Sequence, residues 1–127
     1  MSKGLASALL SATLFAAVAQ AQDPDPATQK RAWTKCRACH SMEVGASKNE
    51  GPTLHGVLGA KAGEQTGFQY SAALKGSGLT WNDETLDKFL TKPSTVVPGN
   101  TMPFPGMPNP EERIAVIAYL KANGGVH

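Results

Sequence analysis

The chain has 127 residues, of which 41% are hydrophobic and 17% charged, and its formal net charge is +2 at pH 7. This length suits a single domain. A net charge so near zero argues against nucleic acid and against an anionic membrane surface as partners.

Residues 1–21 have the pattern of a secretory signal peptide. They begin with a basic residue, Lys3, continue with an apolar run over 5–18, and end with a small-residue Ala-Gln-Ala site at 19–21. The run is shorter than the roughly 20 apolar residues that a membrane-spanning helix needs, and hydroxyl residues interrupt it, so no membrane anchor is expected. We predict cleavage after Ala21 and a soluble mature protein in a bacterial periplasm. Removing 21 of the 127 residues leaves 106.

A polar leader is predicted over residues 22–27, and the first predicted helix begins near its end. Asp25 and Pro26 suit an N-cap and a first helical turn, and the helix is predicted to continue to about Cys39. Ala32, Trp33 and Cys36 would lie along one side of it.

The only two cysteines, Cys36 and Cys39, are three residues apart and are followed by His40. Each thiol can add to one vinyl group of a haem, and the adjacent imidazole can bind the iron, so the motif predicts one covalently attached haem c. Two alternatives remain. They are a redox-active dithiol and a zinc site in which only His40, His55 and His127 could supplement the thiols.

Residues 40–69 show no hydrophobic period and contain many glycines. An irregular segment of this length is unusual inside a small domain. A haem in the interior would supply the missing apolar volume, and glycines would let the backbone approach a flat ring closely. A short helical turn is predicted at 70–75.

A second helix is predicted from Asn82 to Pro93, with Leu86, Phe89 and Leu90 repeating on one face. A third is predicted over 109–123, where Asn109, Pro110 and Glu112 resemble a capping box. Its apolar face is predicted to contain Ile114, Ile117 and Ala118, widened by Val116 and Leu120.

Met102 and Met107 lie in a proline-rich loop between these two helices. A thioether there can come round to the far side of a haem and bind its iron, which would close the iron to other ligands. Met42 is too near His40 to do this, and His55 lies in a turn that is expected to direct it outward. The spacing alone does not decide whether Met102 or Met107 would be the ligand.

Over residues 28–121 the chain resembles the class I cytochromes c of the mitochondrial and bacterial c2 type. Beyond the cysteine motif, the similarity runs through residues 51–59, 70–74, 79–81, 86–93, 98–102 and 117–121. The resemblance implies a monohaem domain over 28–127 with the all-α cytochrome c fold, in which three main helices and long irregular loops surround one covalently bound haem. It also implies that Ala32 or Trp33 faces the last helix at Val116, Tyr119 and Leu120.

The resemblance implies roles for particular residues. His40 and Met102 match the two axial ligands of the iron, and Met107 falls outside the pattern. Pro52 matches the residue whose carbonyl accepts the His40 ring N–H. Tyr70 and Trp81 match residues that satisfy a haem propionate.

Three positions depart from the family pattern. Ala60 stands where many relatives have Arg, Leu74 where Asn is common, and Phe89 where Tyr is frequent. These changes put three polar contacts around the haem in doubt.

The function implied is that of a soluble periplasmic electron carrier and not an enzyme, and we expect a monomer. Its partners would be redox proteins: a bc1-type complex or a dehydrogenase as donor, and a terminal oxidase as acceptor. The ring of lysines found in mitochondrial cytochromes is thinned, so electrostatic steering should be weak. Two alternatives stay open. They are a haem enzyme or gas-binding protein, if Met102 does not bind the iron, and a dedicated subunit of one dehydrogenase.

Overall fold

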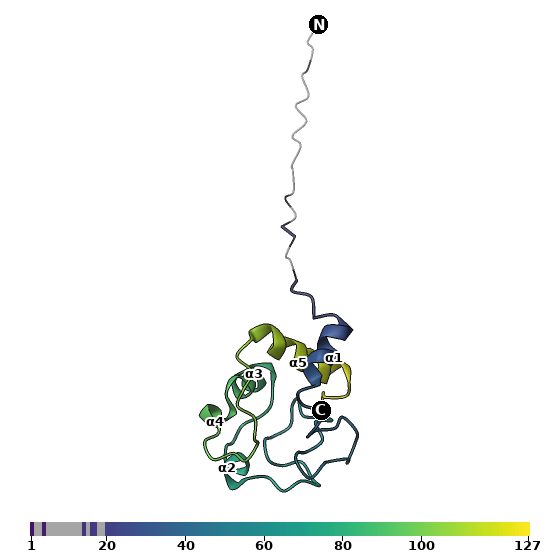
Figure 1. Cartoon of the computed structure of the whole chain (residues 1–127). Coiled ribbons are helices and arrows are strands. Elements are labelled where there is room, and N and C mark those ends of the chain that lie inside the picture. Colours follow the sequence, from purple (N-terminus) through teal and green to yellow (C-terminus); the bar gives the residue numbers. More distant parts are fainter. Residues whose placement is uncertain (2–3, 5–13, 15, 18–19) are drawn as a thin grey trace.

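The computed structural model describes residues 1, 4, 14, 16–17 and 20–127 (Figure 1). The predicted signal peptide at 1–21 lies largely outside these residues. The described part contains five helices: α1 (Pro26–Trp33), α2 (Ala72–Lys75), α3 (Asp83–Thr91), α4 (Pro93–Val96) and α5 (Pro110–Ala122). Within the same part, β pairing is limited to two isolated bridges. The predicted all-α fold with three main helices is confirmed, since α1, α3 and α5 are the longest.

Helix α1 begins where the sequence predicts and ends earlier. The Asp25 side chain accepts hydrogen bonds from the backbone N–H groups of Ala27 and Thr28 at 3.0 and 3.1 Å. The prediction that the helix reaches Cys39 is wrong, because α1 ends at Trp33. Beyond it the chain forms turns with hydrogen bonds between residues three apart, as in a 3₁₀-helix. In one of them the Cys36 N–H donates to the Trp33 carbonyl at 2.8 Å.

Helix α3 follows its predicted pattern closely. The Asn82 side-chain oxygen accepts the Thr85 N–H, and the Thr85 hydroxyl oxygen accepts the Asn82 N–H, so the two residues form a capping box. The three apolar residues predicted to share a face, Leu86, Phe89 and Leu90, are all buried. The helix ends at Thr91, and Pro93 starts the short helix α4, which the sequence pattern did not predict.

Helix α5 begins as predicted, and its predicted apolar face is confirmed except at Ile114: Val116, Ile117, Ala118 and Leu120 are all buried. Asn109 caps the helix by accepting the Glu111 N–H at 2.9 Å. Ile114, placed in the core from its spacing, is 52% exposed, whereas Ala115 is 1% exposed. Ala115 takes the place of Ile114 on the buried face, where α5 packs against α1 and α3.

Helices α1 and α5 pack against each other, as the resemblance implies (Figure 1). The rings of Trp33 and Tyr119 stack with their centroids 4.9 Å apart and their planes 10° apart. Lys35, just past α1, pairs with Glu112 of α5 at 2.6 Å. Helix α3 also packs on α5, so α5 contacts both of the other main helices.

The long segment between His40 and Tyr70 is irregular, as predicted, but it is tied to the rest of the fold. Its Gly59 and Ala60 exchange backbone hydrogen bonds with Trp81, at 2.7 and 2.9 Å. Leu58 bonds the C-terminal residues Gly125 and His127, at 2.7 and 2.8 Å. These ladder-like bonds hold a loop in place that has no helix of its own.

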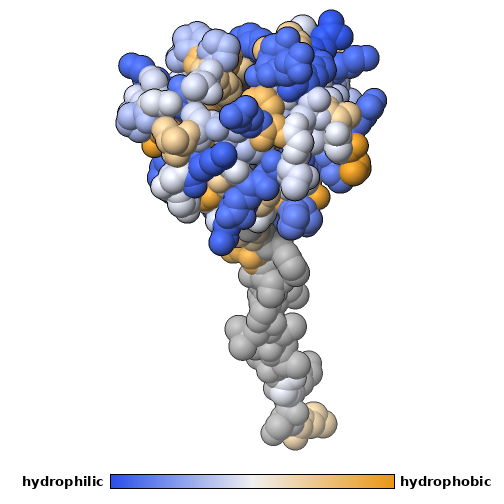
Figure 2. Space-filling model, turned by 90° about the horizontal axis from the view of Figure 1, so that it is seen from below, coloured by the Kyte–Doolittle hydropathy of each residue, from blue (hydrophilic) through white to orange (hydrophobic). Residues whose placement is uncertain are grey.

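The surface is polar, and several of its charges are paired. Hydrophilic side chains cover most of the face shown in Figure 2, with smaller hydrophobic areas between them. Four ion pairs join the described residues: Lys35–Glu112, Lys88–Glu84, Arg113–Asp87 and Lys121–Asp83. No helix in the described part is both long and apolar enough to cross a membrane.

Candidate functional site

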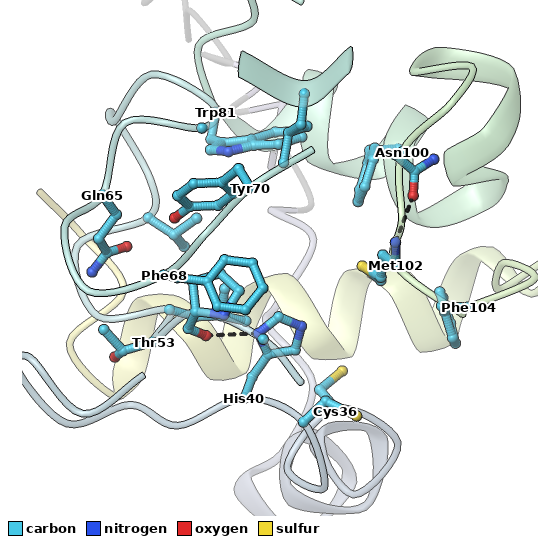
Figure 3. A pocket seen from close by; sticks show the side chains of 18 of the residues that line it. Cys36, His40, Thr53, Gln65, Phe68, Tyr70, Trp81, Asn100, Met102 and Phe104 are labelled. Atoms are coloured by element: carbon cyan, nitrogen blue, oxygen red, sulfur yellow. Dashed lines mark hydrogen bonds between the residues drawn. The ribbon is translucent and has the colours of Figure 1, made fainter. Parts of the chain in front are cut away.

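A cavity lies inside the fold, between the turn at 34–40, the loops at 50–71 and 100–104, and the helices α3 and α5 (Figure 3). Its volume, counted as the space that the centre of a water molecule can occupy, is about 220 Å³. The two helices contribute apolar walls through Leu86, Phe89, Leu90, Val116 and Leu120. Protein interiors leave few voids larger than a water molecule, so a cavity of this size in so small a domain indicates a site for an apolar group.

Cys36 and Cys39 both line the cavity, and both carry free thiols. The turn that follows α1 places them there, one turn apart. Burial raises the pKa of the Cys36 thiol to about 11, although the neighbouring Lys35 acts in the opposite direction. The Cys36 thiol is therefore protonated at neutral pH.

His40 lies in the cavity wall with its ring fixed on two sides. Its Nδ1–H donates to the Pro52 carbonyl oxygen, with 2.7 Å between the heavy atoms. A Cβ at Gly51 would lie 2.7 Å from the ring atom Cε1, so only glycine permits this approach. Burial lowers the pKa of His40, and the bond to Pro52 opposes that effect. The imidazole is thus neutral at neutral pH, with the proton on Nδ1 and a free lone pair on Nε2.

The two methionines of the proline-rich loop have different surroundings. Met102 is half-buried and lines the cavity, and Figure 3 shows it across open space from His40. Met107 is 1% exposed, does not line the cavity, and belongs to the apolar core. Only Met102 can therefore contact a group bound in the cavity.

Tyr70 and Trp81 also line the cavity, on the side away from Met102 (Figure 3). Burial raises the pKa of the Tyr70 hydroxyl, while a hydrogen bond with the Gln65 backbone acts in the opposite direction. Trp81 is 8% exposed and packs edge-on against Phe89, with 5.0 Å between ring centroids. Both residues bring a polar group to a mainly apolar wall.

The three departures from the family pattern all line the cavity. Ala60, Leu74 and Phe89 place apolar side chains there, where the pattern has an Arg, an Asn or a Tyr. The cavity wall is accordingly more apolar than the family pattern implies.

Several residues that position the site were not singled out from the sequence. Asn100 braces Met102: its Oδ1 accepts the Met102 N–H at 3.1 Å, and its Nδ2 donates to the Val97 carbonyl at 2.9 Å. The preference of Asn for turns, just after Pro-Gly, was the available signal. Gln65, Phe68 and Phe104 also line the cavity, and no sequence pattern marked them.

The competing ligand candidates are placed elsewhere. His55 and Met42 do not line the cavity, and His55 packs beside Gly124. Across the described residues, no cluster of three or more His, Cys, Asp or Glu side chains could hold a metal ion. The zinc site considered from the sequence therefore has no ligand set in this part of the chain.

The residues present fit a haem. The cavity has apolar walls, two free thiols, a neutral imidazole with an available nitrogen, and a thioether on another wall. These are the groups needed to attach the ring and to bind its iron from two sides. Fold and site together define a small all-helical haem protein.

Comparisons with known proteins identify the family. No protein-family model matches the chain. Cytochrome c2 of Rhodomicrobium vannielii is 40% identical over 123 residues, which cover 97% of this chain and 98% of that protein. Cytochrome c2 iso-2 of Magnetospirillum molischianum is 52% identical over 89 residues, covering 70% and 91%. Among solved structures, cytochrome cH from Methylobacterium extorquens matches with a TM-score of 0.72 and 46% identity, covering 78% of this chain and 99% of that one.

The chain belongs to the class I cytochrome c family. It carries one covalently attached haem c, and it is an electron-transfer protein rather than an enzyme. The haem-free dithiol protein and the haem enzyme considered from the sequence are thereby excluded.

Proposed function

We propose that this protein carries single electrons through a haem attached to Cys36 and Cys39, with His40 and Met102 as the two axial ligands of the iron. The observation that supports this most directly is the placement of all four side chains around one apolar cavity. When bound, the haem supplies one-electron chemistry between Fe(III) and Fe(II).

The protein's own residues favour a carrier over a reactive site. The Pro52 carbonyl holds the Nδ1 proton of His40 and so leaves Nε2 free to bind iron. Asn100 braces the backbone of Met102, which limits how far the thioether can move between oxidation states. If His40 and Met102 both bind the iron, no position would remain for peroxide or a small gas. A thioether ligand and an apolar wall both favour the reduced state.

Tyr70 and Trp81 are proposed to stabilise a haem propionate through their hydroxyl and indole N–H. They bring polar groups to a wall that Ala60, Leu74 and Phe89 make more apolar. A buried carboxylate needs such donors.

The location that we propose is the periplasm, after cleavage of a signal peptide at Ala21. The alignment with the Rhodomicrobium protein covers 97% of the chain, so that relative has a counterpart of most of residues 1–21. The domain predicted at 28–127 would then follow a short leader predicted at 22–27, although helix α1 already begins at Pro26. Attachment of haem after export would have to precede closure of a Cys36–Cys39 disulfide in that oxidising compartment.

The partners would be redox proteins: a bc1-type complex or a dehydrogenase as donor and a terminal oxidase as acceptor. Contacts of electron carriers are small and short-lived, below about 1,200 Å² of buried surface. A polar surface with paired charges suits such contacts.

Intact mass and a redox titration of the exported protein test this proposal. We expect the mass of residues 22–127 plus one haem, haem that acid and organic solvent do not extract, and one electron taken up per chain. The double variant Cys36→Ser/Cys39→Ser should lose the covalent haem. A wild-type protein whose haem is extractable, or one that takes up no electron reversibly, would contradict the proposal.

A further inference from the structure

The peptide group between Pro52 and Thr53 is hydrogen-bonded at both of its ends. Its carbonyl oxygen, on Pro52, accepts the Nδ1–H of His40 at 2.7 Å. Its N–H, on Thr53, donates to the side-chain oxygen of Ser47 at 3.0 Å. The described chain has no cis peptide bond, so these two groups point to opposite sides of one rigid plane.

Because the plane is rigid, whatever orients the N–H also orients the carbonyl. Ser47 Oγ therefore helps to set the direction of the Pro52 carbonyl, and through it the position of the His40 ring. A donated N–H also polarises the peptide group, which makes its carbonyl a stronger acceptor. Both effects favour a short bond to Nδ1.

Ser47 is itself held firmly. In the residue before it, the Ala46 carbonyl accepts a hydrogen bond from the Ser41 hydroxyl at 2.6 Å. In the residue after it, the Lys48 N–H donates to the Gly51 carbonyl at 2.9 Å. Because the backbone on both sides of Ser47 is held, its hydroxyl oxygen can resist a rotation of the Pro52–Thr53 peptide group, whose N–H it accepts.

Thr53 anchors the other side of the same peptide group. It is fully buried, and its hydroxyl donates to the Glu43 carbonyl at 2.7 Å and accepts the His55 N–H at 3.2 Å. The loop from Ser41 to His55 is thus closed on itself, with the Pro52 carbonyl directed at His40.

From this geometry we infer that Ser47 is a positioning residue for His40, acting through the peptide group between Pro52 and Thr53. The inference rests on the proposed role of His40 as an iron ligand. A stronger bond at Nδ1 makes the imidazole a better donor and stabilises Fe(III), so Ser47 lowers the reduction potential of the haem.

The test uses the haem-loaded protein with three substitutions. Ser47→Ala removes the acceptor, and Ser47→Thr keeps a hydroxyl at the same position. Ser77→Ala is the matched control, because Ser77 makes similar bonds, to the Leu74 carbonyl at 2.8 Å and from the Leu79 N–H at 3.4 Å, and does not line the cavity.

Three quantities are measured for each variant: the exchange rate of the His40 Nδ1 proton by NMR, the midpoint potential, and the free energy of unfolding. In Ser47→Ala we expect that proton to exchange about fivefold faster, the factor for losing one ordinary hydrogen bond, and the potential to rise. Ser47→Thr and Ser77→Ala should keep the wild-type exchange rate and potential.

Each other outcome contradicts a different claim. If Ser47→Ala lowers only the free energy of unfolding, Ser47 is purely structural and the inference is wrong, while the proposed function stands. If the His40 signals of the wild-type protein are not shifted by the iron, His40 is not a ligand, and both the proposed function and the inference are wrong.

Discussion

Met102 and Met107 are five residues apart on one loop, yet only one of them reaches the cavity. The loop's turn at Pro98-Gly99-Asn100 directs Met102 inward, and the Met107 N–H bonds the Leu90 carbonyl of α3 at 2.7 Å. Met107 thereby fills the space beside α3 and serves the core. From residue type alone the two are equivalent, and it is the Pro-Gly-x-x-Met pattern that singles out Met102.

Met107→Ala should lower the free energy of unfolding by about 3 kcal/mol, because it removes a fully buried side chain and leaves a void. Met107→Leu, which nearly conserves volume, should cost less than about 1.5 kcal/mol. Denaturant unfolding of the haem-loaded protein measures both. Met42→Ala is the control, since Met42 is only partly buried and should cost clearly less. Equal losses for Met42 and Met107 would contradict this account of the core.

The contacts around His40 show how far single residues could be predicted. The motif predicts Cys36, Cys39 and His40 without any structure, and the family pattern predicts the partner of Nδ1 at Pro52. Gly51 belongs to the segment that resembles the family, but its close approach to the His40 ring was not predicted, and Ser47 carried no signal. Their importance depends on a ring and a peptide group brought together by a loop whose path has no periodicity in the sequence.

At the scale of elements, the N-caps of the helices were easier to predict than their buried faces or the residues at which they end. Asp25, Asn82 and Asn109 all cap helices where the sequence placed them, because a capping side chain acts on backbone only two or three residues away. The end of α1 at Trp33 and the exposure of Ile114 depend on distant packing, which local patterns do not contain. The short helix α4 is four residues long and leaves no periodic trace.

The cap of α1 should make this helix sensitive to acid. The Thr28 hydroxyl and backbone N–H hold the pKa of Asp25 below its ordinary value of 3.8. Because the folded-state pKa is the lower one, the carboxylate stabilises the helix fully above pH 3.8, and this contribution is lost as the pH falls through the folded-state pKa.

Amide hydrogen exchange at Ala27 and Thr28 between about pH 5 and pH 2 measures this effect, after correction for the intrinsic rates. Protection should fall with acid in the wild type and change less in Asp25→Asn, whose amide oxygen can accept the same bonds without titrating. Asp23→Asn, just outside the helix, should behave as the wild type does. The same acid response in Asp25→Asn would show that another group is responsible.

At the scale of the whole molecule, the surface charge is small and partly neutralised. Two of the lysines, Lys35 and Lys88, are paired with carboxylates. Without the predicted signal peptide at 1–21, two haem propionates would bring the net charge from about +1 to about −1. Long-range attraction to a partner should accordingly be weak.

The rate of electron exchange with a redox partner should therefore depend little on salt. We expect a fall of less than about threefold as ionic strength rises from about 20 to 200 mM, measured by stopped-flow absorption. Glu112→Gln, which frees Lys35, should change this dependence. Glu64→Gln should serve as its control, because Glu64 forms no ion pair among the residues that the structure describes. A steep fall with salt in the wild type would contradict weak steering.

The central claim is that Met102 closes the iron and so makes the protein a carrier. The long-wavelength absorption band of the oxidised haem, which a bound thioether produces, tests it most directly in the wild type, Met102→Ala and Met107→Ala. The account predicts that the band is present in the wild type and in Met107→Ala and absent in Met102→Ala. A wild-type protein without the band, or a band that survives Met102→Ala, would contradict it.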